Sequence, residues 1–179
     1  MNASSGRRGG SPYDLGHDDA KYPLARVLEA AELASLLQPD TLPALKKAMT
    51  DSDSAVRYWG TLGVLMRGSN AVAEAHTELQ TALKDASADV RITAAQALAQ
   101  FGVEADVKAM LPLLADHADW KNYTVFSSLA TLNSLDALGT KAVPLATLIK
   151  TMPTNGPAPD AHYKSYVGRL IEDLRDRLK

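Results

Sequence analysis

A seven-residue segment occurs twice in this chain with the same placement of its charged residues. Asp51 to Arg57 reads DSDSAVR and Asp85 to Arg91 reads DASADVR, and a glycine follows each arginine after 11 residues. The second copy begins 34 residues after the first, which is the length of one helix-turn-helix repeat. Such units bury their apolar faces only against their neighbours, so this period predicts a stacked array of helices.

The apolar residues repeat with the same period. Four segments carry them at i, i+3, i+6 and i+7, which is one stripe along a helix. The four sets are Leu42, Leu45, Ala48 and Met49; His76, Leu79, Ala82 and Leu83; Val107, Met110, Leu113 and Leu114; and Ala142, Leu145, Leu148 and Ile149. They predict the first helix of four pairs.

The second helices of three pairs align in the same way. Two of the four aligned positions hold small residues in every copy, which indicates close approach between helices of neighbouring repeats. The three sets are Val56, Gly60, Gly63 and Val64; Val90, Ala94, Ala97 and Leu98; and Ser127, Thr131, Ser134 and Leu135.

The two ends of the chain differ from the repeats. Residues 1–22 are rich in Gly, Ser and turn-forming residues and are interpreted as a linker. A leading helix is expected from Pro23 to Leu37, with its apolar stripe at Leu24, Val27, Leu28, Ala31, Leu33, Leu36 and Leu37. A closing helix is expected at 162–178, with a polar outer face made by Glu172, Asp173, Arg175, Asp176 and Arg177. We therefore predict one all-α domain at 23–179, a right-handed α-solenoid of about four helix pairs behind a leading helix.

Composition excludes several classes of partner and chemistry. The 179 residues carry a formal net charge of −2 with scattered basic residues, so nucleic acid is not expected as a partner. No apolar stretch is long enough to cross a bilayer, and no membrane partner is expected. The absence of cysteine rules out disulfides, thiolate nucleophiles and cysteine metal sites.

The charged residues of the repeated segment have two interpretations. Asp51 and Asp85 end a first helix, and Arg57 and Arg91 lie in the first turn of the second, where a guanidinium can fork onto the Asp of the same or the adjacent repeat. We interpret these four residues as repeat-stabilising, because they recur with the repeat. The alternative is a row of ligand-binding side chains.

The pattern Leu-Pro-x-Leu, Asp-x-x-x-x-Val-Arg and Gly resembles HEAT repeats over residues 42–139 and more loosely over 143–178. A narrower resemblance is carried by the sequences SPYD at 11–14, KYPL at 21–24, LEAAEL at 28–33, AVRYW at 55–59 and LNSLDALG at 132–139. Together these segments are similar to the helical C-terminal extension of bacterial sulfatases of the heparan N-sulfatase-like group.

This resemblance implies a module without a catalytic domain. Sulfatases mature a Cys or Ser in the pattern Cys/Ser-x-Pro-x-Arg and hold calcium with Asp and Asn. Here Ser11-Pro12 has the wrong spacing and no following Arg. The resemblance thus implies a non-catalytic partner of a sulfatase acting on sulfated glycans, exported if a preceding signal directs it.

Two groups of side chains remain as candidate sites. His17, His117 and His162 each lie near a carboxylate, but their spacing promises no metal site, and they are interpreted as solvated turn residues. No catalytic residue, cofactor site or metal ligand is expected. The candidate interface residues are aromatic, and the alternative is that they pack on the array itself; they are Tyr13, Tyr22, Trp59, Trp120 and Tyr123.

Three functions are consistent with these features. The first is an interaction or accessory module whose partner is a protein, either a sulfatase catalytic domain in cis or another chain. The second is a stand-alone scaffold or an enzyme of the helical-repeat type that attaches bilin pigments, which needs a polar pocket that the positions of Thr93, Gln96 and Asn133 do not clearly supply. The third is binding of an acidic polysaccharide, which needs one basic face made by Arg67, Lys108, Lys121, Lys141 and Lys150.

Overall fold

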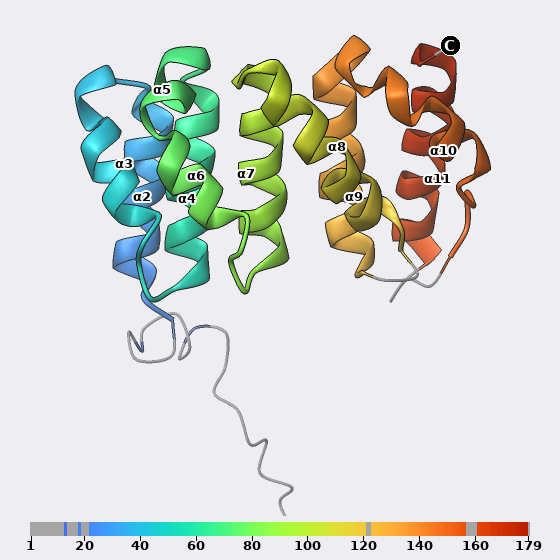
Figure 1. The fold of residues 1–179 in the computed structure, drawn as a ribbon. Helices are drawn as coiled ribbons and strands as arrows, with labels where there is room; N and C mark the ends of the chain where they lie inside the picture. The colour runs from blue at the N-terminus through green and yellow to red at the C-terminus, as the bar shows by residue number, and fades with distance from the viewer. Residues whose placement is uncertain (1–12, 14–17, 19–21, 121–122, 157–160, 179) are drawn as a thin grey trace, which may run out of the picture.

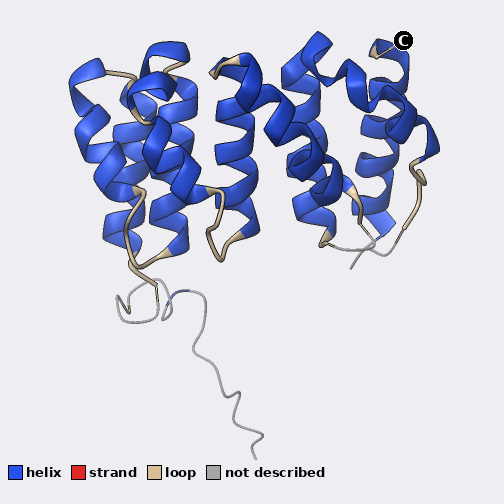
Figure 2. Cartoon of the chain, viewed as in Figure 1, coloured by secondary structure: helices blue, strands red, loops and turns tan. Residues whose placement is uncertain are grey.

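The computed structural model describes residues 13, 18, 22–120, 123–156 and 161–178, and for 161–164 the backbone alone. Every regular element in these residues is a helix (Figure 2), which confirms the all-α prediction. The linker expected at 1–22 lies almost entirely outside the described residues.

The helices form two layers (Figure 1). One layer is a row in which each helix packs on the next, made of α2 (Leu24–Leu36), α4 (Ser54–Met66), α7 (Ala88–Phe101), α9 (Val125–Leu138) and α11 (Ala161–Arg177). The second layer contains α3 (Leu42–Ala48), α6 (His76–Ala82), α8 (Glu104–Ala118) and α10 (Ala146–Thr151). In this layer α3 packs on α4, α6 on α7, α8 on both α7 and α9, and α10 on α11. Short helical segments at Pro39–Thr41, Ser69–Glu74 (α5) and Gly139–Leu145 connect them.

Side chains of both layers meet in a continuous apolar core. Its largest fully buried members include Leu45, Leu79, Leu98, Leu114, Leu132, Leu135, Ile149, Ile171 and Leu174. Most of these residues belong to the stripes expected from the sequence. The fourth stripe is an exception, because Leu148 is 42% exposed, and Ala142 and Leu145 lie in the short helical segment before α10.

Polar side chains begin two of the row helices. The Asp53 carboxylate accepts hydrogen bonds from the backbone N–H groups of Ala55 at 2.8 Å and Val56 at 3.4 Å at the start of α4. Thr124 Oγ1 accepts one from Ser127 N–H at 3.2 Å at the start of α9. These oxygens satisfy N–H groups that have no partner within the helix.

The small residues of α4 bring it close to α3. A Cβ at Gly60 would lie 2.8 Å from the backbone nitrogen of Met49 and 2.9 Å from the carbonyl oxygen of Leu45. This close approach is therefore within one helix pair, whereas the sequence interpretation assigned it to neighbouring repeats. Gly63 fits that interpretation better, because a Cβ there would lie 3.1 Å from Cα of Ala34 in the preceding row helix.

The expected apolar stripe of the leading helix is correct at Val27, which is buried, but wrong at Leu28 and Leu36. Leu28 is 59% exposed and Leu36 is 50% exposed, while Val27, Ala30 and Ala34 are buried. Alanines can face α4 at short range, so the buried side of α2 is its small-residue side and the larger leucines point away from it.

Cationic side chains close the C-terminal ends of several helices. Arg67 donates to the carbonyls of Leu33 at 2.8 Å and Ala34 at 3.2 Å near the end of α2. Arg175 donates to three carbonyls at the end of α10, including Met152 O at 2.6 Å, so it does not belong to the polar outer face expected for the closing helix. Carbonyls at a helix C-terminus carry partial negative charge, which these cations neutralise.

Candidate functional site: a groove along α4, α7 and α9

Arg57 joins successive units of the row. Its Nε and Nη2 donate to Asp85 Oδ2 at 2.6 Å and Oδ1 at 2.8 Å, while Nη1 donates to the carbonyls of Asp51 and Ser52 at 2.9 Å each. The guanidinium and the Ser87 N–H both hold the pKa of Asp85 below its ordinary value. All these partners are groups of the protein itself, so the fork is occupied by the array rather than open to a ligand.

Arg26 makes the corresponding contact one unit earlier. Its Nη1 lies 2.6 Å from both carboxylate oxygens of Asp51, whose Oδ1 also accepts from Asp53 N–H at 2.8 Å. This backbone hydrogen bond and Arg26 lower the pKa of Asp51. The sequence interpretation omitted Arg26, although its place in the first turn of α2, like that of Arg57 in α4, was a usable signal.

Arg91 meets a histidine instead of a carboxylate. Its Nε and Nη2 lie 3.4 and 3.3 Å from His117 Nε2, and His117 Nδ1 lies 3.0 Å from the Leu113 carbonyl oxygen. Burial lowers the pKa of His117, which favours the neutral ring with its proton on Nδ1 and Nε2 as acceptor. Tyr123 stacks on this ring at 4.1 Å and donates to Asp116 Oδ2 at 2.6 Å, which raises the pKa of Tyr123.

The structure corrects the expectations for two histidines. His117 is 4% exposed and lies in the last turn of α8, so it is not a solvated turn residue. His76, expected in an apolar stripe, instead has a half-exposed side chain whose Nε2 lies 3.0 Å from Oδ1 of the buried Asp106. Sequence spacing alone did not reveal either contact, because both join residues of different helices.

The five aromatic residues expected at an interface do not form one surface. Trp120 is 1% exposed, and a Cβ at Gly156 would lie 2.7 Å from its ring, so Trp120 packs inside the array and is not available to a partner. Trp59 is half-buried against Val27 and Ala30 of α2. Tyr123 is also half-buried, and only Tyr13 and Tyr22 are exposed.

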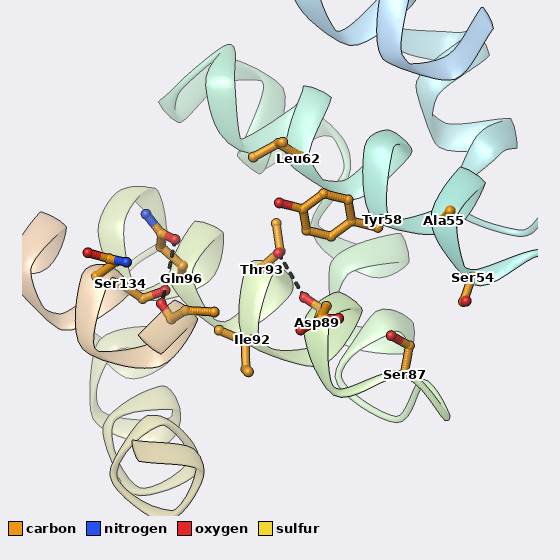
Figure 3. Close-up of a pocket in the computed structure, with 12 residues that line it drawn as sticks. Ser54, Ala55, Tyr58, Leu62, Ser87, Asp89, Ile92, Thr93, Gln96 and Ser134 are labelled. Carbon is orange, nitrogen blue, oxygen red and sulfur yellow. Dashed lines mark hydrogen bonds between the residues drawn. The ribbon is translucent and has the colours of Figure 1, made fainter. Parts of the chain in front are cut away.

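A groove of about 590 Å³ lies along the row. Its lining comes from α4, α7, α9 and their N-terminal turns, and none comes from the second layer (Figure 3). The residues that line it are Ser54, Ala55, Tyr58, Leu62, Ser87, Asp89, Ile92, Thr93, Gln96, Ala130, Asn133 and Ser134. We call it the row groove.

The row groove has a mixed chemistry. Figure 3 shows the ring of Tyr58 projecting from α4 toward Thr93 of α7, and burial together with the charge of Asp89 raises the pKa of Tyr58. Ser134 Oγ donates to Gln96 Oε1 at 2.9 Å, which fixes the side chain of Gln96 across from α9. Asn133 is exposed at the rim. The positions of Thr93, Gln96 and Asn133 therefore do supply a polar pocket, contrary to the expectation from sequence.

The basic residues considered for polysaccharide binding are largely engaged elsewhere. Arg67 donates to backbone carbonyls, and Lys141 Nζ donates to Gln100 O at 2.7 Å. Lys108 pairs with Glu104 at 2.7 Å, and Lys121 lies outside the described residues. Lys150 is exposed in the last turn of α10.

The described residues contain no cluster of His, Asp and Glu able to hold a metal ion. Among the described helices, none combines the length and apolar character needed to cross a bilayer. No known protein-family profile matches the chain, and no curated protein is significantly similar to it.

Proposed function

We propose that this chain is a non-catalytic helical-repeat module of the HEAT type that binds a segment of another polypeptide in the row groove. The observation that carries the proposal is the lining of that groove, where amides, hydroxyls and apolar side chains from three successive helices face one channel. A repeat array with such a channel offers a long surface to an extended ligand.

The groove side chains suit a peptide backbone. Asn133 carries a donor and an acceptor, which match the C=O and N–H of an extended chain, whereas the amide of Gln96 is bound by Ser134 and Gln100. Leu62 supplies apolar contact, and Asp89 supplies a negative charge at one end, whereas Ile92 is 1% exposed. Such a lining favours a peptide with alternating apolar residues and a basic side chain opposite Asp89.

Selection of peptides from a random library against the full chain tests this proposal. Replacing the exposed Asn133 with Arg should weaken the selected peptides by about tenfold or more, because the long cation occupies the groove. The matched control is Ala109→Arg on the exposed side of α8, which should leave binding unchanged. If the selected peptides bind Asn133→Arg as tightly as they bind the wild-type chain, the row groove is not the binding site.

The resemblance to sulfatase C-terminal extensions suggests one partner class. We propose that the array serves a sulfatase catalytic domain acting on sulfated glycans, joined to it in one chain or bound to it. The purified chain should then leave chromogenic sulfate esters intact, and turnover that scales with protein purity would rule out the non-catalytic assignment.

The polar lining of the row groove also supports a second candidate function. An enzyme of the bilin-attaching helical-repeat type needs a polar pocket on this face, and Tyr58, Asp89 and Gln96 line one. Mixing the chain with a free bilin separates the two functions. A shifted absorption band that disappears in Asn133→Arg favours pigment handling, and an unchanged spectrum favours the peptide-binding module.

A further inference from the structure

Three arginines connect successive units of the array in the same way. Each lies in the first turn of a row helix and reaches a side chain at or just after the end of the second-layer helix that precedes the next row helix. In chain order the three contacts are Arg26 with Asp51, Arg57 with Asp85, and Arg91 with His117. We call them the first, second and third arginine contact.

The third arginine contact keeps the geometry of the second but has a different acceptor. In both, Nη1 donates to two carbonyls of the preceding turn, while Nε and Nη2 face the acceptor. Arg57 meets a carboxylate at 2.6 and 2.8 Å, whereas Arg91 meets Nε2 of His117 at 3.4 and 3.3 Å. His117 therefore occupies the place that Asp85 has one unit earlier, and its ring can change charge near neutral pH.

The next row helix does not continue the series. The position in α9 that corresponds to Arg57 and Arg91 holds Ser128, which is fully buried and whose Oγ has no hydrogen-bond partner in the described part of the chain. The third arginine contact thus joins α7 to the pair of α8 and α9 through a neutral ring, where the earlier units are joined by ion pairs.

The surroundings of the His117 ring determine the effect of a proton there. Nδ1 lies 3.0 Å from the Leu113 carbonyl oxygen, so a second proton would go to Nε2, which could then no longer accept from Arg91. The charged and titratable groups at the ring are Arg91 from α7, Asp116 from α8 at 3.8 Å and Tyr123 from the segment before α9, stacked at 4.1 Å. Asp116 already accepts from the Tyr123 hydroxyl, so it offsets the new charge only in part.

We propose that the third arginine contact is a pH-dependent hinge: a proton on His117 breaks the contact with Arg91, and the N-terminal ends of α7 and α9 move apart. Burial and the charge of Arg91 lower the pKa of His117 in the closed state, so the open state binds the proton more readily. Opening is therefore favoured as the pH falls below the ordinary histidine pKa of 6.5.

The neighbouring contacts confine the movement to this hinge. Hydrogen bonds from backbone N–H groups and from the arginines lower the pKa values of Asp51 and Asp85, so the first and second arginine contacts stay closed in the same range. Ser134 binds Gln96, and Lys141 binds the Gln100 carbonyl, in the C-terminal half of α7. These bonds hold that half against α9 and the segment after it, so the helices tilt and stay joined.

Distances between nitroxide labels test the hinge on the full chain, which contains no cysteine of its own. One label pair, at Asp89→Cys and Phe126→Cys, spans the third arginine contact, and a second pair, at Ser54→Cys and Asp89→Cys, spans the second; all three positions are exposed. Between pH 7.5 and 5, double electron–electron resonance should show longer and broader distances for the first pair and unchanged distances for the second.

Variants of the acceptor separate the hinge from a general effect of acid. His117→Asp gives Arg91 a carboxylate, His117→Gln gives it an acceptor that does not titrate, and both should keep the first label pair at its short distance at pH 5. Asp85→His should make the second label pair respond to pH as well. Circular dichroism at pH 5 should show the helix content of pH 7.5.

The proposal is overturned if the first label pair keeps its distance at pH 5 in the wild-type background, or if it lengthens equally in His117→Gln. It is also overturned if the second pair lengthens together with the first, or if helix content is lost at pH 5, because the chain then opens as a whole.

Discussion

At the scale of single residues, the contact between Arg57 and Asp85 is the one whose loss should cost most. Both side chains are mostly buried, at 16% and 9% exposure, and the arginine also serves two carbonyls. Arg57→Ala leaves the Asp85 carboxylate with the Ser87 N–H alone and removes the donor of both carbonyls, so the free energy of unfolding should fall by about 2–3 kcal/mol. Urea unfolding followed by circular dichroism measures it.

The matched control is Arg26→Ala. Arg26 makes the same kind of pair with Asp51, but its side chain is 48% exposed, so the loss should stay near or below about 1 kcal/mol. Equal losses in the two variants would contradict the claim that burial sets the strength of these pairs. A double-mutant cycle with Asp85→Ala isolates the interaction itself.

His117 should make the stability depend on pH. Burial lowers its pKa below the ordinary value of 6.5, so the unfolded chain takes up the proton more readily than the folded one. Its contribution is therefore complete above pH 6.5 and is lost as the pH falls below that value. Protonated His117 also faces the cation of Arg91, which the nearby Asp116 only partly offsets.

The variant His117→Gln keeps an acceptor for Arg91 but does not titrate. Between pH 7.5 and 5, wild-type protein should lose more unfolding free energy than this variant, as measured by urea titration at each pH. Parallel pH profiles would show that His117 titrates as an exposed histidine does.

At the scale of elements, close packing should outweigh helix propensity. Gly60→Ala favours the helix by about 1 kcal/mol, but its Cβ would meet backbone atoms of α3 at 2.8 and 2.9 Å. We expect a net loss of about 1–2 kcal/mol. Gly63→Ala should cost less, because its closest contacts are the methyl ends of Leu45, which can rotate. Thermal unfolding of both variants measures the order, and a stabilised Gly60→Ala would contradict the close approach.

The helices also show which parts of the fold could be predicted from the sequence. The paired helices follow from apolar residues at helical spacing, because one helix face must be buried. The buried side of α2 could not be found in this way, since Ala30 and Ala34 are as compatible with exposure as with burial. Trp120 was misplaced because it lies in an irregular segment, which has no period, and His117 because α8 continues through Ala118, beyond the expected end of that helix. The burial of both is decided by distant partners such as Gly156 and Arg91.

The row groove illustrates the same limit for the site. The sequence did not indicate a polar pocket at Thr93, Gln96 and Asn133, yet all three line the row groove. Whether a hollow lies between them depends on the spacing of α4, α7 and α9, and the short side chains at Ala130 and Ser134 leave that space open. The apolar period carries no information about this spacing.

At the scale of the whole molecule, the layered arrangement predicts that a destabilising substitution loosens only the helices near it. Each row helix packs on its neighbours, and α2 and α11 stand at opposite ends (Figure 1). Leu174 of α11 is 1% exposed, so Leu174→Ala should cost about 2–5 kcal/mol. In an array held by contacts between neighbours, that loss should appear in the amide hydrogen exchange of α10, α11 and α9.

The amides of α2 should keep their wild-type exchange rates in Leu174→Ala. The reciprocal control is Val27→Ala in α2, which removes a buried side chain at the other end and should speed exchange in α2 and α4 while sparing α11. Uniform acceleration across all helices in either variant would mean that the chain unfolds as a single unit, with its ends coupled through the central α7. Separate responses would instead show that each end can loosen to admit a partner while the rest of the array stays folded.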